Sequence, residues 1–239
     1  MATNRSTTES ASRPRISSRG RQGLAKVAGV VVFFAVTLFA SSGRIDWVMA
    51  WVYMGMLVVN TIVIVQLMDP GLVDERAGMR EGAKKWDIPL TIFVGRLGPL
   101  ACLIVAGLDQ RYGWSGQVSQ GLQIGGAVVA ALGLALGDWA MIANKFFSPL
   151  VRIQEERGHV VVSSGPYRFV RHPGYSAGVW GNLATPVMLS SWWAFIPAGM
   201  TVIAMVIRTV LEDQTLREEL DGYEEYAQRV RYRLIPGIW

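Results

Sequence analysis

Hydrophobic residues along the chain gather into six long runs separated by short polar segments. The runs cover residues 24–40, 47–68, 89–108, 118–143, 175–189 and 192–210. Most of them approach or exceed the ~18 mainly apolar residues that a membrane-spanning helix requires. Two serines, Ser190 and Ser191, separate the last two runs, which predicts a tight hairpin. The pattern therefore predicts an all-α integral membrane protein, a bundle of about six hydrophobic helical segments whose last two form a hairpin.

The two ends of the chain differ from this pattern. Residues 1–23 are rich in Ser, Thr, Arg and Gly, a composition that predicts a disordered basic tail. This tail and the first run superficially resemble a signal peptide, but the run is long for one and no clear cleavage site follows it. We expect it to be retained as the first of four transmembrane helices within residues 24–143. From Glu212 onwards, apolar residues recur every three or four positions among charges, which predicts a helix that extends into water.

Lysine and arginine are distributed unevenly among the loops. The N-terminal tail and the segments 69–88 and 144–174 are basic, whereas the turns between them hold only Arg44 and Arg111. Because basic loops stay on the cytoplasmic side, we expect a multi-pass protein with both termini in the cytoplasm. The net charge of +5 is concentrated near these predicted membrane surfaces. Membrane lipids are therefore expected partners, and nucleic acid is not, since no Lys/Arg stripe alternates with exposed aromatic residues.

Cysteine and histidine are scarce in the chain. Cys102, inside the third run, is the single cysteine, so we expect no internal disulfide framework and no thiolate cluster. His159 and His172 lie 13 positions apart and have no cysteine partners. We therefore expect no metal site and no metal partner.

A charged and proline-rich segment, GPYRFVRHPGYSAG, occupies residues 165–178 at the threshold of the fifth run. Pro173 biases His172 towards an extended conformation, and the glycines allow sharp turns or close approach to a ligand. Backbone groups exposed in this way at membrane depth need hydrogen-bond partners, which a polar ligand could supply. The alternative is a rigid re-entrant turn whose Arg171 and His172 reach towards lipid headgroups.

Two further patterns carry candidate chemistry. The β-branched run Val160, Val161 and Val162 favours an extended backbone that could bind the edge of an adenine, although a short buried linker is the alternative. Arg208 and Glu212 are four residues apart and share a helical face where the last apolar run ends. They form either an ion pair worth about a few tenths of a kcal/mol or a ligand site. Ionisable residues at a membrane surface favour the second interpretation.

The C-terminal segments together resemble a known family. The motif SSGPYRFVRHPGYSAG, a hydrophobic hairpin and then RTVLEDQTLREELDGYEEYAQRVRYRLIPGIW resemble the isoprenylcysteine carboxyl methyltransferase family of integral membrane enzymes. The wider group includes the phospholipid methyltransferases. The resemblance covers roughly residues 140–239, and it is the combination of motifs that is specific. One position departs from the pattern, since Asp213 follows Glu212 where a second Glu is usual.

The resemblance implies S-adenosylmethionine as the cofactor, bound at the cytosolic side by a catalytic region over residues 144–239. That region would hold the cofactor pocket, the helical hairpin and a C-terminal helix. The residues that the resemblance implies around the cofactor are Gln154, His159, Val160, Val161, Val162, Tyr167, His172, Pro173, Gly174, Tyr175 and Glu212. We expect Arg208 to face the substrate, and Arg208, Glu212 and Arg171 to be the catalytic residues.

Methyl transfer from a sulfonium donor is an in-line displacement that needs alignment and exclusion of water more than acid–base groups. The resemblance implies a lipophilic acceptor from the bilayer, the C-terminal carboxylate of a prenylcysteine or a similar lipid-like acid, which Arg208 could orient. A phospholipid amine or a small thiol is the alternative acceptor and would need a base. Sterol reductases that use NADPH carry a similar Arg-His-Pro-x-Tyr stretch, but usually have Asn at the position of Gly174. A non-enzymatic membrane scaffold is the remaining alternative.

Overall fold

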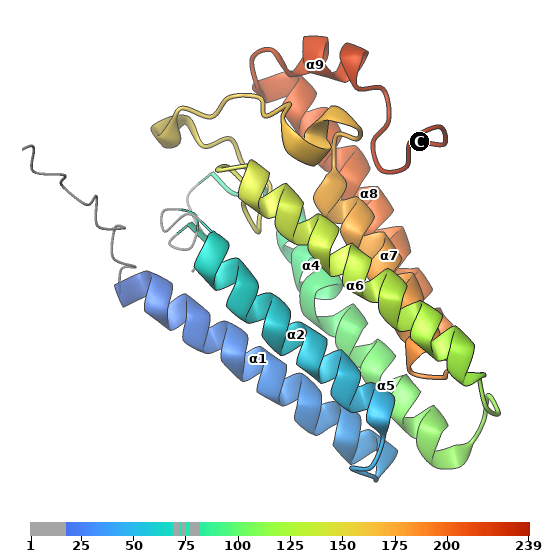
Figure 1. Cartoon of the computed structure of the whole chain (residues 1–239). Helices are drawn as coiled ribbons and strands as arrows, with labels where there is room; N and C mark the ends of the chain where they lie inside the picture. The colour runs from blue at the N-terminus through green and yellow to red at the C-terminus, as the bar shows by residue number, and fades with distance from the viewer. Residues whose placement is uncertain (1–17, 69–71, 73–74, 77–81) are drawn as a thin grey trace, which may run out of the picture.

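Helices form the framework of the computed structural model, which describes residues 18–68, 72, 75–76 and 82–239 (Figure 1). In chain order the elements are α1 (Ser18–Ser42), α2 (Val48–Leu67), α4 (Asp87–Ile92), a π-helical turn (Phe93–Leu97), α5 (Gly98–Tyr112), α6 (Gln120–Ala143), two 3₁₀ turns (Glu155–Arg157 and Gly165–Arg168), α7 (Pro173–Met188), α8 (Phe195–Glu219) and α9 (Tyr223–Arg229). No strand occurs within these described ranges. The predicted all-α class is confirmed.

The hydrophobic runs of the sequence coincide with the long helices. Five segments are long and apolar enough to cross a membrane: Ala25–Ser42, Val48–Leu67, Asp87–Tyr112, Gln120–Ala143 and Phe195–Glu219. The third of these is one rod composed of α4, the π-helical turn and α5. The fifth predicted run forms α7, which has 16 residues and is shorter than a full span. The protein is therefore an integral, multi-pass membrane protein.

The predicted N-terminal tail lies only partly among the described residues. Residues 1–17 are outside them. Helix α1 begins at Ser18, so the prediction of disorder is wrong for residues 18–23, which form the first turns of α1. This stretch combines Arg and Gln, which favour helices, with Ser and Gly, which do not, and its continuity with an apolar helix lets that helix extend backwards through it.

Close packing of α6 against α7 organises the C-terminal half of the bundle. Glycines of α6 face the backbone of α7, and a Cβ atom at Gly126 would lie only 2.7 Å from the amide nitrogen of Met188. The predicted hairpin of α7 and α8 is confirmed, with Ser190 in a left-handed conformation (φ 56°) at its turn. On the other side of the bundle α1, α2 and α5 share an apolar core that includes Leu38, Ala50 and Leu103.

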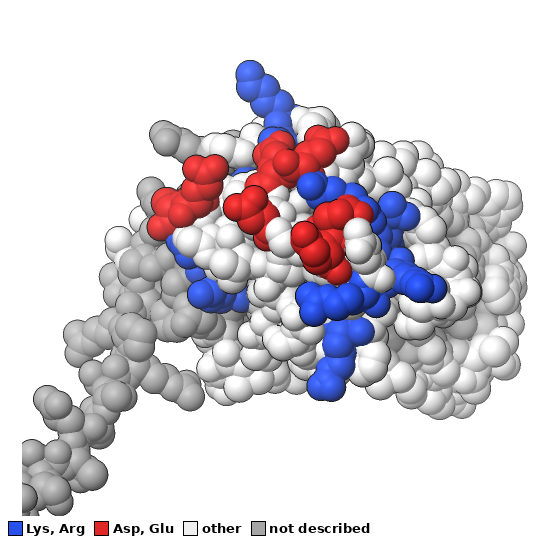
Figure 2. All heavy atoms as spheres, turned by 90° about the horizontal axis from the view of Figure 1, so that it is seen from above, with Lys and Arg blue, Asp and Glu red and all other residues white. Residues whose placement is uncertain are grey.

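Charged side chains gather at one end of the bundle (Figure 2). The segment after α6, the end of α8, α9 and the C-terminus all lie at this end (Figure 1). The flanks of the long helices instead expose large apolar residues such as Val36, Val59 and Leu132, as expected of a surface that contacts lipid. The polar end is the one that the loop charges predict to face the cytoplasm, and its side of the membrane stays a prediction.

Candidate active site

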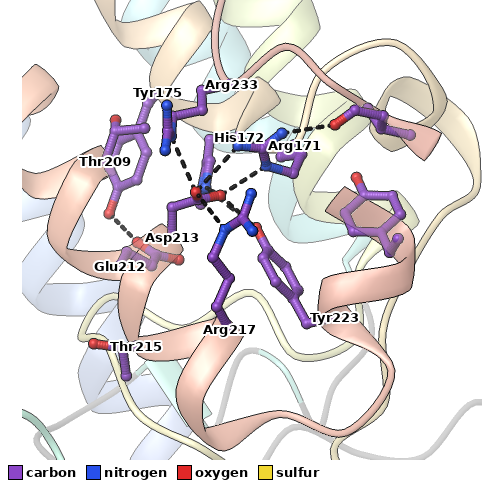
Figure 3. A network of polar contacts seen from close by, with 12 residues as sticks. Arg171, His172, Tyr175, Thr209, Glu212, Asp213, Thr215, Arg217, Tyr223 and Arg233 are labelled. Carbon is purple, nitrogen blue, oxygen red and sulfur yellow. Dashed lines mark hydrogen bonds and ion pairs between the residues drawn. The ribbon is translucent and has the colours of Figure 1, made fainter. Parts of the chain in front are cut away.

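The carboxylate of Asp213, on α8, lies at the centre of a polar network at the charged end (Figure 3). The residue is 1% exposed. Nε atoms of Arg171 (2.7 Å), Arg233 (3.0 Å) and Arg217 (3.2 Å) donate to it, the hydroxyl of Tyr223 donates at 3.0 Å, and Nε2 of His172 lies 3.2 Å away. Five side chains thus converge on one buried carboxylate, and its lone pairs are filled.

Arg171 extends this network to the C-terminal segment. Its Nη1 donates to the backbone oxygens of Val230 at 2.7 Å and Arg231 at 2.8 Å. The amides of Arg171 and His172 donate to the oxygens of Tyr232 and Arg233, each at 2.9 Å. The last residues of the chain are therefore held against the start of α7 by the same arginine that pairs with Asp213. We call this assembly, Arg171, His172, Asp213, Arg217, Tyr223 and Arg233, the Asp213 network.

A second polar group surrounds Arg208, one helical turn before Glu212. The guanidinium of Arg208 forms a bidentate ion pair with Asp87 of α4 (2.6 and 2.8 Å) and also donates to the oxygen of Pro149 at 2.7 Å. It lies 5.3 Å from the ring centroid of Tyr175, within the range of a cation–π contact. The hydroxyl of Tyr175 in turn donates to Glu212. We call Asp87, Tyr175, Arg208 and Glu212 the Arg208 cluster.

Asp87 was not among the residues that the sequence indicated. It is fully buried and also accepts a hydrogen bond from the amide of Val151 at 2.7 Å. Within the described part of the chain, it is Asp87 and not Glu212 that forms the ion pair of Arg208. The signal was present in the sequence, because Asp87 stands at the entrance of the third apolar run, where a lone carboxylate needs a cationic partner.

Gln154 and His159 form a compact turn against Phe146. The side-chain Nε2 of Gln154 donates to the backbone oxygen of Phe146 at 2.6 Å, its Oε1 accepts from Arg157 at 2.6 Å, and the residue is fully buried. The ring of His159 packs 4.5 Å from that of Phe146. Burial, and then the charges of Arg152 and Arg157, lower the pKa of His159 to about 4. His159 is therefore neutral at pH 7 and acts as an uncharged hydrogen-bonding ring.

The three valines do not act as a unit. Val160 is exposed, whereas Val161 and Val162 pack with Tyr167 and Tyr226 in an apolar cluster beneath α9. The hydroxyl of Tyr226 donates to the backbone oxygen of Tyr167 at 2.7 Å. Burial raises the pKa of the Tyr167 phenol above its usual value, so this group stays protonated. Tyr167 is thus part of the support of α9.

A cavity of about 320 Å³ is lined by residues of α2, α5, α6 and α7, and its lining on α7 begins at Gly174, the residue before Tyr175 of the Arg208 cluster. Phe147 and Gly174 line its end at the first turn of α7. A Cβ atom at Gly174 would lie 2.8 Å from Cζ of Phe147, so glycine is needed for the ring to pack there. Pro173 occupies the first helical position of α7, where a missing amide hydrogen has no cost. The candidate site therefore joins a polar end to an apolar chamber.

The structure distributes the predicted cofactor residues over neighbouring groups. Tyr175 and Glu212 meet in the Arg208 cluster, and His172 joins the Asp213 network with its ring 5.9 Å from that of Tyr175. Gln154 and His159 lie in the turn around Phe146, which directly precedes Phe147 of the cavity. The polar end thus offers a carboxylate, phenol and imidazole groups and aromatic faces.

The fold and the site define a helical, multi-pass membrane protein with a polar site at one end of the bundle and an intramembrane cavity next to it. Residues 127–218 match the model of the isoprenylcysteine carboxyl methyltransferase (ICMT) family. This match confirms the resemblance of the C-terminal segments. It includes α7 and most of α8 and ends before Tyr223 and Arg233 of the Asp213 network.

Several relatives align with a little under half of the chain. A probable protein-S-isoprenylcysteine O-methyltransferase of Oryza sativa subsp. indica is 29% identical over 108 residues, which are 44% of this chain and 56% of the relative. Protein-S-isoprenylcysteine O-methyltransferase B of Arabidopsis thaliana is 32% identical over 108 residues, 44% and 55% of the two chains. The human protein-S-isoprenylcysteine O-methyltransferase is 28% identical over 117 residues, 46% and 39%. The chain thus spans about half the length of the first two relatives and less of the third.

A solved structure, entitled a eukaryotic intramembrane Ras methyltransferase ICMT without a monobody, is similar over most of both chains. The alignment covers 93% of this chain and 98% of that chain, with 17% sequence identity and a TM-score of 0.47.

Proposed function

We propose that this protein is a membrane methyltransferase that moves the methyl group of S-adenosylmethionine to the carboxylate of a lipophilic acceptor, a prenylcysteine or a similar lipid-like acid. The observation that carries the proposal is that the lining of the intramembrane cavity on α7 begins at Gly174, directly before Tyr175, which joins Glu212 and Arg208 in the Arg208 cluster. A charged methyl donor and a hydrophobic methyl acceptor can meet only where a polar site adjoins an apolar one. The names of the relatives, which are protein-S-isoprenylcysteine O-methyltransferases, support the same choice.

The residues at the polar end fit S-adenosylmethionine chemically. When bound, this cofactor supplies an electrophilic methyl group on a sulfonium centre. Glu212 would hold its cationic or hydroxyl groups, because the carboxylate is partly exposed and Tyr175 is its hydrogen-bond donor. Neutral His159, which is only partly buried and is backed by Phe146, would offer a ring face to the adenine. His172 and Tyr175 complete the aromatic surroundings.

Arg208 is suited to orient the acceptor. A carboxylate is already a nucleophile at pH 7, so no residue has to remove a proton, and alignment is the main requirement. The planar guanidinium can bind a second carboxylate while it is held by Asp87. We assign Arg171 to positioning, because its guanidinium is occupied by Asp213 and by backbone oxygens and therefore fixes His172 beside the site.

We further propose that the polar end faces the cytoplasm with both termini. The basic segments at this end support the orientation. A reporter enzyme fused to the C-terminus tests it, because a reporter that requires the cytoplasm should be active there. Activity confined to a reporter that requires the opposite side would exclude the proposed topology.

A labelling experiment tests the proposed reaction. Purified protein in lipid nanodiscs is incubated with methyl-labelled S-adenosylmethionine and N-acetyl-S-farnesylcysteine. A methyl ester releases its label as methanol in mild alkali, whereas methylated amines and thiols do not. We expect alkali-labile label that depends on the acceptor. Alkali-stable label would indicate a phospholipid or thiol methyltransferase, oxidation of NADPH with a sterol would indicate a reductase, and binding of neither cofactor would indicate a scaffold.

A further inference from the structure

The intramembrane cavity is elongated along α7. Its lining on this helix extends from Gly174 to Thr185, which corresponds to about 16 Å at the rise of an α-helix. Glycines keep it open, since a Cβ atom at Gly181 would meet nothing within 4 Å. A chamber of this length suits an extended hydrocarbon chain whose reactive end lies at Gly174.

One wall of the cavity carries a polar pair. Asp138 of α6 and Asn60 of α2 both line it, and Nδ2 of Asn60 donates to Oδ2 of Asp138 at 2.7 Å. Two polar side chains of the lining bond within α7: Asn182 donates to the oxygen of Gly178 and Thr185 to that of Gly181, each at 2.8 Å. Asp138 is different, because among the described residues only Asn60 donates to it.

Asp138 lies close to the reactive end of the cavity. The preceding residue, Gly137, faces α7, and a Cβ atom there would lie 3.5 Å from Cβ of Ala177. Asp138 is therefore close to the level of Ala177, about one helical turn from Gly174. A carboxylate at this depth is costly and marks a functional site by default. A carboxylate can accept several hydrogen bonds, and the single bond from Asn60 leaves Oδ1 available for one from a ligand.

We propose that Asp138, held by Asn60, recognises an N–H or O–H group that the lipophilic acceptor carries beside its reacting carboxylate. The proposal rests on the proposed function for the identity of the reacting group. The carboxylate of Asp138 accepts the hydrogen bond, and the donor group is placed one helical turn from Gly174. Asp138 and Asn60 would thus select acids with such a donor over plain fatty or prenyl acids.

A set of matched acceptors tests this proposal. The first is N-acetyl-S-farnesylcysteine, the second is its N-methylated form, which lacks the amide hydrogen, and the third has a hydroxyl in place of the acetamide. In the wild type we expect kcat/KM for the first to exceed that for the second by about tenfold, the range of a hydrogen bond to an ionised group. High activity with the third compound as well would show that Asp138 also recognises a hydroxyl donor. Low activity with the third compound would show that it recognises only an amide N–H.

Variants of Asp138 decide the assignment. In Asp138→Leu the ratio of kcat/KM for the first methyl acceptor to that for the second should fall to about one, since the carboxylate that accepts the hydrogen bond is gone. Asp138→Asn keeps the shape and should lower the ratio about fivefold, because a neutral amide accepts more weakly, so this variant carries the test if the Leu variant does not fold. Asp46→Asn, which removes an exposed carboxylate paired with Arg44, should retain the full ratio.

An unchanged ratio in the Asp138 variants would overturn the proposal. A wild type that methylates none of the acceptors would instead overturn the proposed function. In that case thermal stabilisation of the protein by each acceptor replaces the rate as the readout. Greater stabilisation by the first acceptor than by the second in the wild type, with a clearly smaller difference in Asp138→Asn, would still support recognition by Asp138. Equal stabilisation in the wild type would contradict it.

Discussion

Glu212 and Asp213 are neighbours on α8, and they have opposite surroundings. Asp213 is 1% exposed and is surrounded by five side chains, three of them arginines. Glu212 is only partly buried, and the hydroxyl of Tyr175 is its hydrogen-bond donor within the described residues. Successive residues of a helix point about 100° apart, so α8 directs one carboxylate into the Asp213 network and the other towards Tyr175.

The two carboxylates therefore differ in role: one stabilises the structure around the site, and the other can bind a ligand. A carboxylate whose lone pairs are filled by fixed donors stabilises the arrangement of those donors, and here it joins α7, α8, α9 and the C-terminal segment (Figure 3). A carboxylate with open acceptor capacity can bind a ligand. In this account the Asp213 network builds the site, and the Arg208 cluster contacts the ligands.

The largest expected effect is on stability, from removal of the central carboxylate. Asp213→Ala would leave Arg171, Arg217 and Arg233 close together without the carboxylate that they share, and Arg217 would retain only its pair with Glu224. Breaking a buried ion pair by removing one partner costs about 3–5 kcal/mol. We expect this loss in the free energy of unfolding, measured by denaturation in mixed detergent micelles. Glu225→Ala, an exposed carboxylate on α9, is the control, and an equally small effect of both variants would show that the network is not structural.

Arg208 and Asp87 should show a similar but smaller loss that a double substitution restores. Arg208→Leu alone leaves Asp87 buried and unpaired, at a cost of about 3 kcal/mol. Replacing both residues by Leu removes both charges and should recover most of the stability while acceptor methylation stays lost. Full methylation by the stable double variant would show that Arg208 does not orient the acceptor. The melting temperature reports the stability of each variant, and label transfer measured in the same preparations reports methylation of the acceptor.

A filled cavity should affect the acceptor and leave the fold intact. Gly181→Leu places a side chain into open space, and about two methylenes of the acceptor would lose their place, at ~0.8 kcal/mol each. We expect the KM for the acceptor to rise about tenfold while cofactor affinity is unchanged. Gly199→Leu, on α8, also meets nothing within 4 Å but lies outside the cavity lining, so it should leave KM unaltered.

A further expected effect, which appears only below pH 6.5, is a pH dependence of stability from His159. Its pKa is lowered from 6.5 to about 4 by burial and the nearby arginines, so the unfolded chain binds a proton at a pH where the folded protein does not. Stability should therefore fall as the pH is lowered from 6.5 to about 4 and then level off. His159→Asn should remove this part of the dependence. An identical pH profile for the variant would mean that His159 is not buried as described.

The sequence predicted the helices better than the contacts between them. Hydrophobic runs are a local signal, and they located the spans and the hairpin of α7 and α8. The ion pair of Arg208 with Asp87 joins residues 121 positions apart, and that of Arg171 with Asp213 joins residues 42 apart. Nothing in a single sequence fixes which helices become neighbours, so these partners were not identified. Asp213 drew notice only as a departure from a family pattern, although it is the most densely bonded carboxylate described here.

Calorimetric titration of S-adenosylmethionine tests the separation of Glu212 from Asp213 most directly. Glu212→Gln keeps the shape of the side chain and removes its charge, and a contact with a charged group is worth about 1.5–3 kcal/mol. We predict that the dissociation constant of S-adenosylmethionine from the Glu212→Gln variant is at least tenfold higher than from the wild type, about 1.4 kcal/mol. The melting temperature of this variant should equal that of the control Glu218→Gln, which changes an exposed carboxylate of α8. Unchanged affinity together with a lowered melting temperature in Glu212→Gln would contradict the account, because Glu212 would then belong to the scaffold.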